Sequence, residues 1–270
     1  MSSMTPAPVM PVRVNLRHQL FGAWCAPIFS VLTLAGWIGF AHFYDPAAAS
    51  LSPAATADFF RDHRDGILLG GSLFILACGP LALWTAQLGL QLREIEGASP
   101  LMAIGQVLAG VSIVVIIVID ASLWMGAAYR PGADGQIVQA LNDAAWLGFL
   151  IAWPILSMQM LCAAVVTLHD RRDEPLVSRW VSWASVVGAI ALVTAGGPAF
   201  THSGPFAFDG LLGMYVPVAI WGAWLDGHAW YMRKAVRRRQ LALEAAEEPG
   251  PEPREVAELV AFQPTPAPDG

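Results

Sequence analysis

The sequence has few charged residues for its length. Asp, Glu, Lys and Arg make up 13% of its 270 residues, about half of the roughly 25% found in soluble globular proteins. Hydrophobic residues make up 56%. A chain with so little charge cannot cover a water-facing surface, so the composition excludes an ordinary soluble protein and indicates a membrane protein.

The sequence also lacks the motifs of common soluble enzymes. It contains no glycine-rich phosphate loop, no GxSxG and no HExxH. Its three cysteines, Cys25, Cys78 and Cys162, lie in separate apolar stretches, so we expect neither a disulfide nor a cysteine-based metal site. No cofactor, resident metal or nucleic-acid partner is predicted. The expected partner is the lipid bilayer, with a small apolar ligand, a membrane-protein partner or a homo-oligomer left open.

Six apolar stretches are long enough to cross a bilayer. A hydrocarbon core of about 30 Å needs about 20 helical residues, and this length is reached at residues 22–44, 67–91, 101–128, 144–168, 179–198 and 210–232. The sequence therefore predicts an all-α membrane protein, a six-helix transmembrane bundle within residues 21–233. Residues 1–20 are expected to be a disordered cytoplasmic N-terminus. Residues 234–270 are expected to be a basic juxtamembrane segment followed by a disordered acidic, proline-rich tail.

The distribution of basic residues predicts the orientation of the bundle. Six crossings place both termini on one side of the membrane, which then carries Arg13, Arg17, Arg93, Arg171, Arg172, Arg179, Arg233, Lys234, Arg237, Arg238 and Arg239 near the spans. The other side carries only Arg61, Arg64 and Arg130. Because Lys and Arg are enriched in cytoplasmic loops, both termini are predicted to be cytoplasmic. The preference for Arg over Lys and the abundance of Ala fit a GC-rich bacterial genome, hence a bacterial cytoplasmic (inner) membrane.

Proline patterns predict a surface helix and helix kinks. Ser52 followed by Pro53 is a typical helix start, so a short outer helix is expected before the second span and is expected to end at Gly66. Within the spans lie Pro27, Pro80, Pro154 and Pro217. Each removes a helical hydrogen bond. Four such breaks favour a bundle with a cavity over straight packed helices.

Asp120 is the clearest candidate for a functional residue. An ionisable side chain at the centre of a membrane helix costs at least about 2.5–3.5 kcal/mol on insertion scales, which makes it a functional candidate by default. Helical spacing places Asp120 on one face with Gln106, Gly110, Ile113, Ile117 and Trp124. We predict that this face points into the bundle and that the ligand-binding residues are Asp120, Trp124, Trp153, Asn142 and Asp143. A structural explanation stays open, in which Asp120 is neutral or bound to Arg130 or a helix hydroxyl.

Asp226 is a second acid, on the cytoplasmic side of the last span. Ala219, Gly222 and Ala223 precede it at helical spacing and form a small-residue face that would let another helix approach closely. An ion pair across that contact is the simpler explanation of Asp226. Its expected partners are Arg171, Arg172 and Arg179.

Four other polar residues reach the outer leaflet in the predicted topology. They are His42, Asp45, His202 and Asp209. Two histidines with several carboxylates could hold a divalent metal, shuttle protons or bind a polar headgroup. Loop residues that face water would explain the same set without any function.

Four short segments carry a resemblance to a group of membrane proteins. They are FFRDHR at residues 59–64, LNDAAW at 141–146, PLVSRW at 175–180 and SGPFAFDG at 203–210. With them the chain resembles a group of uncharacterised multi-spanning bacterial integral membrane proteins, over most of residues 20–240. The resemblance implies a fold and a location, and no activity or catalytic residue.

These features predict a polytopic inner-membrane protein that binds or passes a small apolar or amphipathic molecule. The expected cavity opens to the outer side and has Asp120 as its polar anchor. Two alternatives stay open. One is an accessory or scaffold subunit of a membrane complex; the other is a membrane-embedded enzyme with an outer-leaflet His/Asp site, with or without a metal.

Overall fold

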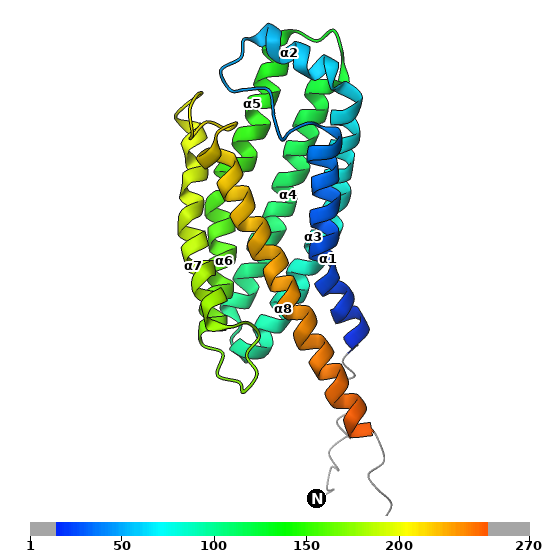
Figure 1. The fold of residues 1–270 in the computed structure, drawn as a ribbon, viewed down its shortest axis with the longest axis vertical. Coiled ribbons are helices and arrows are strands. Elements are labelled where there is room, and N and C mark those ends of the chain that lie inside the picture. The colour runs from blue at the N-terminus through cyan, green and yellow to red at the C-terminus, as the bar shows by residue number, and fades with distance from the viewer. Residues whose placement is uncertain (1–14, 248–270) are drawn as a thin grey trace, which may run out of the picture.

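The computed structural model describes residues 15–247, and every regular element among them is helical (Figure 1). The elements are α1 (Leu16–Leu34), η1 (Ala35–Phe40), α2 (Pro53–Asp62), α3 (Arg64–Glu96), α4 (Leu101–Tyr129), α5 (Gly135–Ile151), α6 (Trp153–Leu168), α7 (Arg179–Ala191), η2 (Leu192–Ala199), η3 (Leu211–Tyr215) and α8 (Val216–Glu247). The predicted all-α class is confirmed for this part of the chain. The predictions for residues 1–14 and 248–270 lie outside the described residues.

Five helical stretches are long and apolar enough to cross a membrane. They are Leu16–Phe40, Arg64–Glu96, Leu101–Tyr129, Gly135–Leu168 and Arg179–Ala199. Each contains or overlaps one of the first five predicted spans, so the prediction of several membrane-spanning helices is supported. The sixth predicted span, residues 210–232, lies mostly in α8, which is not among these five stretches. Asp226, His228 and the basic residues that follow lower its mean hydropathy.

The outer helix α2 begins as its sequence predicts. The Ser52 side chain accepts a hydrogen bond from the Ala55 backbone N–H at 3.3 Å, and Pro53 occupies the first turn. The prediction that Gly66 ends this helix is wrong. The chain turns at His63, and Gly66 lies inside α3 against the Phe40 backbone, where a Cβ would collide with the Phe40 carbonyl. This glycine is therefore needed for close packing and not for a turn.

Helical geometry is irregular at the end of the bundle that carries α2, which we call the α2 end. There, η1 and η3 are π-helical and η2 is a 3₁₀ helix. Of the four span prolines, Pro27 and Pro80 lie inside continuous helices, whereas Pro154 follows the break between α5 and α6. Pro217 lies in the first turn of α8, directly after η3. Two of the four prolines thus coincide with a break.

Helix α8 crosses the bundle obliquely (Figure 1). Helices α3 and α4 pack along each other, α1 packs against α3, and α6 packs against α4 and α7. Helix α8 packs mainly against α1. The two helices meet in their lower halves and diverge toward the α2 end (Figure 1). This divergence positions the cavity described below.

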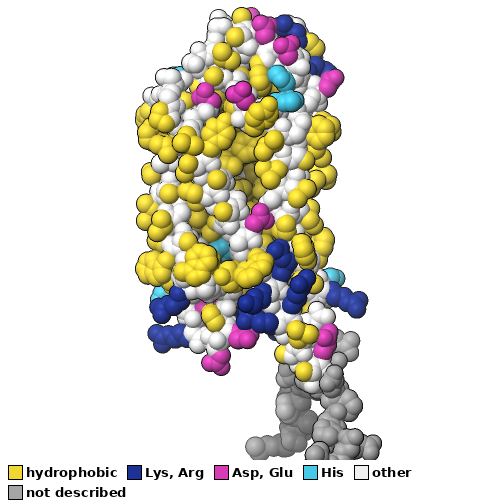
Figure 2. Space-filling model, viewed as in Figure 1, with side chains coloured by type: hydrophobic (Ala, Val, Ile, Leu, Met, Phe, Trp, Pro, Cys, Tyr) yellow, Lys and Arg dark blue, Asp and Glu magenta, His cyan; other side chains and the backbone are white. Residues whose placement is uncertain are grey.

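The side chains divide the surface into bands (Figure 2). A wide hydrophobic band crosses the middle of the visible face. Basic side chains gather at the end opposite α2, which we call the arginine-rich end. Trp24, Trp180, Trp183 and Trp230 are 42–69% exposed, as expected for interfacial residues. Trp146, by contrast, is fully buried.

Asp170 organises the loop between α6 and α7. Its side chain is fully buried and accepts four hydrogen bonds, from Nε (2.8 Å), Nη2 (2.7 Å) and the backbone N–H (3.2 Å) of Arg172 and from the backbone N–H of Leu176 (2.8 Å). Burial by itself raises the pKa of Asp170, but these donors outweigh it and hold the pKa below its ordinary value.

Asp170→Asn is expected to lower the free energy of unfolding by about 1–3 kcal/mol, because it weakens a buried hydrogen-bonded acceptor. Thermal unfolding in detergent measures the effect, with the exposed Asp173→Asn as control. The depressed pKa means that the contribution is present at neutral pH and is lost as the pH falls below the ordinary Asp value of about 4. A gap between wild type and Asp170→Asn that stays undiminished in acid would contradict this explanation.

Candidate functional site

A cavity of about 430 Å³ lies between α1, α8 and a wall formed by α4, α5 and α6. It extends from Tyr44 and Tyr215 near the α2 end to Ser30 and Asp226. Figure 2 shows the face of the molecule hollowed within its hydrophobic band. Between Pro217 and Asp226 alone, α8 rises about 14 Å. The cavity is therefore long, with room for an extended ligand.

Small residues on α8 leave this space open. Ala219 and Gly222 line the cavity, and a Cβ added at Gly222 would meet no other atom within 4 Å. The expectation that this small-residue face packs closely on another helix is therefore wrong. The reason is the oblique course of α8, which separates this part of it from α1 (Figure 1).

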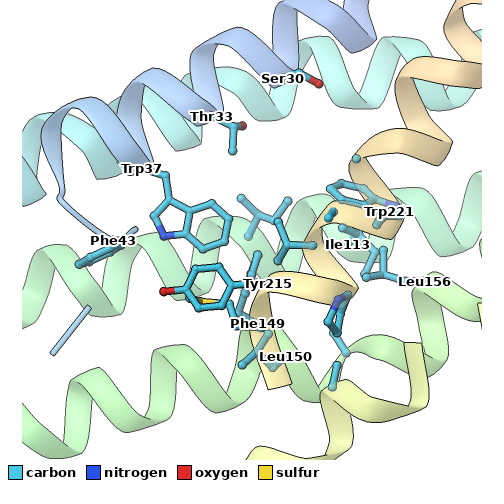
Figure 3. Close-up of a pocket in the computed structure, with 18 of the residues that line it drawn as sticks. Ser30, Thr33, Trp37, Phe43, Ile113, Phe149, Leu150, Leu156, Tyr215 and Trp221 are labelled. Carbon is cyan, nitrogen blue, oxygen red and sulfur yellow. The ribbon is translucent and has the colours of Figure 1, made fainter. Parts of the chain in front are cut away.

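Aromatic rings form much of the cavity wall (Figure 3). Trp37 projects from the π-helical η1 and contacts Phe74 and Phe149, with ring centroids 6.2 and 5.4 Å apart. Trp221 of α8 meets the edge of Phe29 at 5.7 Å. Large rings that brace one another cannot rotate freely to fill the space between them, so the wall is held in place.

The end of the cavity nearest α2 is closed by a hydrogen bond. The Tyr215 hydroxyl in η3 donates to the Tyr44 carbonyl at 2.6 Å. This contact joins the start of α8 to the segment that follows η1. Because η1 and η3 both depart from α-helical geometry, the two segments can bend toward each other here although α1 and α8 diverge below them.

Few polar groups face the cavity, and Asp226 is the only acid among its lining residues. The Ser30 hydroxyl donates to Asp226 Oδ2 at 2.8 Å. Asp226 Oδ1 is buried and has no hydrogen-bond partner within residues 15–247. The same holds for Thr33 Oγ1, Trp37 Nε1 and Trp221 Nε1.

Asp226 has no cationic partner within 4.0 Å in the described part of the chain. The ion pair expected with Arg171, Arg172 or Arg179 is therefore not formed, and Arg172 pairs with Asp170 instead. Arg233 lies seven residues along α8, but its guanidinium stacks over the Trp24 ring at 4.4 Å and donates to the Ala23 carbonyl at 3.4 Å.

Asp120 lies behind the cavity wall and does not line it. Its side chain is 2% exposed and packs against Gly148 of α5, where an added Cβ would lie 2.5 Å from Asp120 Oδ1. Oδ2 has no partner among the described residues, so neither the expected Arg130 nor a helix hydroxyl binds it. Helical spacing identified the inward face of α4 correctly, but it could not say that α5 covers this face.

Of the five predicted ligand-binding residues, only Trp153 lines the cavity. Trp124 is buried against Trp146, with ring centroids 4.8 Å apart. Asn142 is 2% exposed and Asp143 is half-buried, and both lie on α5 away from the cavity. The sequence reasoning missed Ser30, Thr33, Trp37 and Tyr215. The first three follow three- and four-residue steps, a pattern that could have indicated a polar face on the first span.

The four outer-leaflet residues do not form one cluster around a metal. The His42 ring lies 4.9 Å from that of His63, a residue outside the predicted set, and His42 has a positive φ of 55°. Asp45 follows η1, whereas His202 and Asp209 lie between η2 and η3. Across residues 15–247, no group of three or more His, Cys, Asp or Glu side chains is arranged to hold a metal ion.

Comparisons with known proteins found no matching family model, no matching curated protein and no matching solved structure. The resemblance to multi-spanning bacterial membrane proteins accordingly stays a prediction. A fold alone does not assign a function, whereas the geometry and chemistry of the cavity limit what it can bind.

Gly148→Ala is expected to destabilise the protein by about 1–3 kcal/mol, because the new methyl group would displace the buried Asp120 carboxyl. Thermal unfolding measures the effect. Gly126→Ala is the matched control, since its nearest neighbour would be Leu141 Cδ1 at 4.0 Å. Replacing Asp120 by Ala in the Gly148→Ala background should restore stability; a double variant no more stable than Gly148→Ala would show that the contact is not the cause.

Proposed function

We propose that this protein spans a bacterial cytoplasmic membrane six times, with both termini cytoplasmic. On this proposal it binds a small apolar or amphipathic molecule in the cavity between α1 and α8. The observation that carries the function is the cavity itself, whose wall is almost entirely apolar and rich in aromatic rings. Ligand cavities in proteins are typically about 300–1,000 Å³ with a few polar groups for orientation, and this cavity fits that description.

The positions of the polar residues in α8 support this helix as the sixth crossing. Asp226 lines the cavity, and His228 is 1% exposed, with Nδ1 2.9 Å from the Trp224 carbonyl. These side chains therefore lower the mean hydropathy of α8 without facing lipid, as expected for polar groups in membrane helices. The start of α1 and the end of α8 lie toward the same end of the bundle (Figure 1), which agrees with an even number of crossings.

The exposed residues at the opening of the cavity support entry of the ligand from the lipid phase. Leu34 and Ile38 of α1 line the cavity and are 52% and 48% exposed. The hydrophobic band of Figure 2 surrounds the opening. An apolar molecule dissolved in the bilayer could therefore enter between α1 and α8 without crossing water. This route differs from the opening to the outer aqueous side that the sequence predicts.

The orientation predicts a labelling pattern in intact cells. Gly132→Cys, in the exposed loop between α4 and α5, should react with a membrane-impermeant maleimide from outside. Asp173→Cys, in the loop between α6 and α7, should react only after the membrane is opened. The native cysteines are buried and provide the low background. The reverse pattern would contradict the proposed orientation.

A larger side chain inside the cavity is expected to block ligand binding. Gly222→Leu should fold normally, because its side chain enters open space, and should reduce labelling several-fold when proteoliposomes are irradiated with a photoreactive long-chain alcohol. Mass spectrometry of the labelled peptides gives the readout.

Gly227→Leu is the matched control for this test. It lies on the same helix, an added Cβ would also meet nothing within 4 Å, and it does not line the cavity. Its labelling should equal that of the wild type. If Gly222→Leu and Gly227→Leu were labelled alike, the α1–α8 cavity would not be the binding site.

A further inference from the structure

We infer that the ligand of the α1–α8 cavity carries a protonated amine and that Asp226 binds it. The chemical class is a lipophilic amine, with one ammonium group on an extended apolar body. This inference rests on the proposed function and adds the headgroup to it. The juxtaposition that carries it is a carboxylate without a cationic partner among the described residues, at the end of the cavity away from α2, with aromatic rings in the cavity wall.

The carboxylate of Asp226 has only one hydrogen-bond donor among the described residues. Ser30 donates to Oδ2, whereas Oδ1 is buried and has no partner in the described chain. A carboxylate in an apolar environment is costly unless a cation or several donors balance it. One hydroxyl supplies only part of that balance. An ammonium group, with three N–H donors and a positive charge, would supply the rest.

The basic side chain nearest along the helix is already engaged. Arg233 is about 10 Å farther along α8, where the Trp24 ring and the Ala23 carbonyl hold its guanidinium. The other arginines of the arginine-rich end that form ion pairs do so elsewhere, Arg238 with Glu174 and Arg239 with Glu94. No ion pair within 4.0 Å neutralises Asp226 among the described residues, so we expect its charge to attract a cationic headgroup and to repel a carboxylate or a phosphate.

The aromatic rings favour the same headgroup. Trp221 lies five residues before Asp226, and Phe29 is adjacent to Ser30. These two rings meet edge to face and line the same cavity as Asp226. Aromatic faces attract ammonium groups, most strongly where water is excluded. Beyond them the wall consists of residues such as Ile113, Leu156 and Val218, which suit an alkyl chain or another apolar body.

A competition experiment tests this headgroup. Proteoliposomes containing the full chain are labelled with the photoreactive long-chain alcohol, and unlabelled amine, alcohol and carboxylic acid of equal chain length compete. In the wild type, the amine should displace the probe at a roughly tenfold lower concentration than the alcohol, the size of effect expected for a hydrogen bond to a charged group. The acid should be the weakest competitor.

Two variants assign the effect to Asp226. Asp226→Asn keeps the shape of the side chain and removes its charge, so the amine and the alcohol should compete equally. Asp45→Asn removes an exposed carboxylate outside the cavity and should behave as the wild type.

Each result has a definite meaning. An amine preference that survives in Asp226→Asn, or that disappears equally in Asp45→Asn, would overturn the inference. Equal competition by the amine and the alcohol in the wild type would also overturn it, while the proposed function would stand. If the probe labelled Gly222→Leu as strongly as the wild type, that result would instead refute the proposed function itself.

Discussion

The hydrogen bond from Ser30 to Asp226 joins α1 to α8, and the shape of the cavity depends on it. Lipid provides no hydrophobic driving force between helices, so close packing and polar contacts determine where membrane helices cross. On the arginine-rich side of this bond, Arg233 adds contacts to Ala23 and Trp24. On the other side the helices diverge (Figure 1). This polar contact therefore lies where the two helices begin to diverge, and it includes the acid that lines the cavity.

The cavity also depends on irregular helices and rigid rings. Through π-helical η1 and η3 the chain reaches the contact between Tyr215 and Tyr44, which closes the α2 end. Trp37 is braced by Phe74 and Phe149. Regular helices with small side chains could pack until the space disappeared, whereas braced aromatic rings hold their positions. Breaks in helical geometry at a binding site are consistent with the frequent use of π segments at functional sites.

Two acids in apolar helices have different surroundings. Asp120 was the stronger candidate from the sequence because it follows a long apolar run, yet α5 covers it at Gly148. Asp226 was expected to pair with an arginine of a neighbouring loop, yet it faces the cavity. Sequence spacing shows which side of a helix is polar or small. It does not show whether a neighbouring helix, a side chain or a cavity lies opposite.

The sequence by itself determined the properties that depend on consecutive residues. The helical class, five of the candidate spans and the start of α2 at Ser52 and Pro53 follow from local hydropathy and capping, which a single segment carries. Only the tertiary structure decided that Ser30 lies beside Asp226, 196 positions away in the chain. The oblique path of α8 produces that contact and the cavity, and it results from packing among several helices at once.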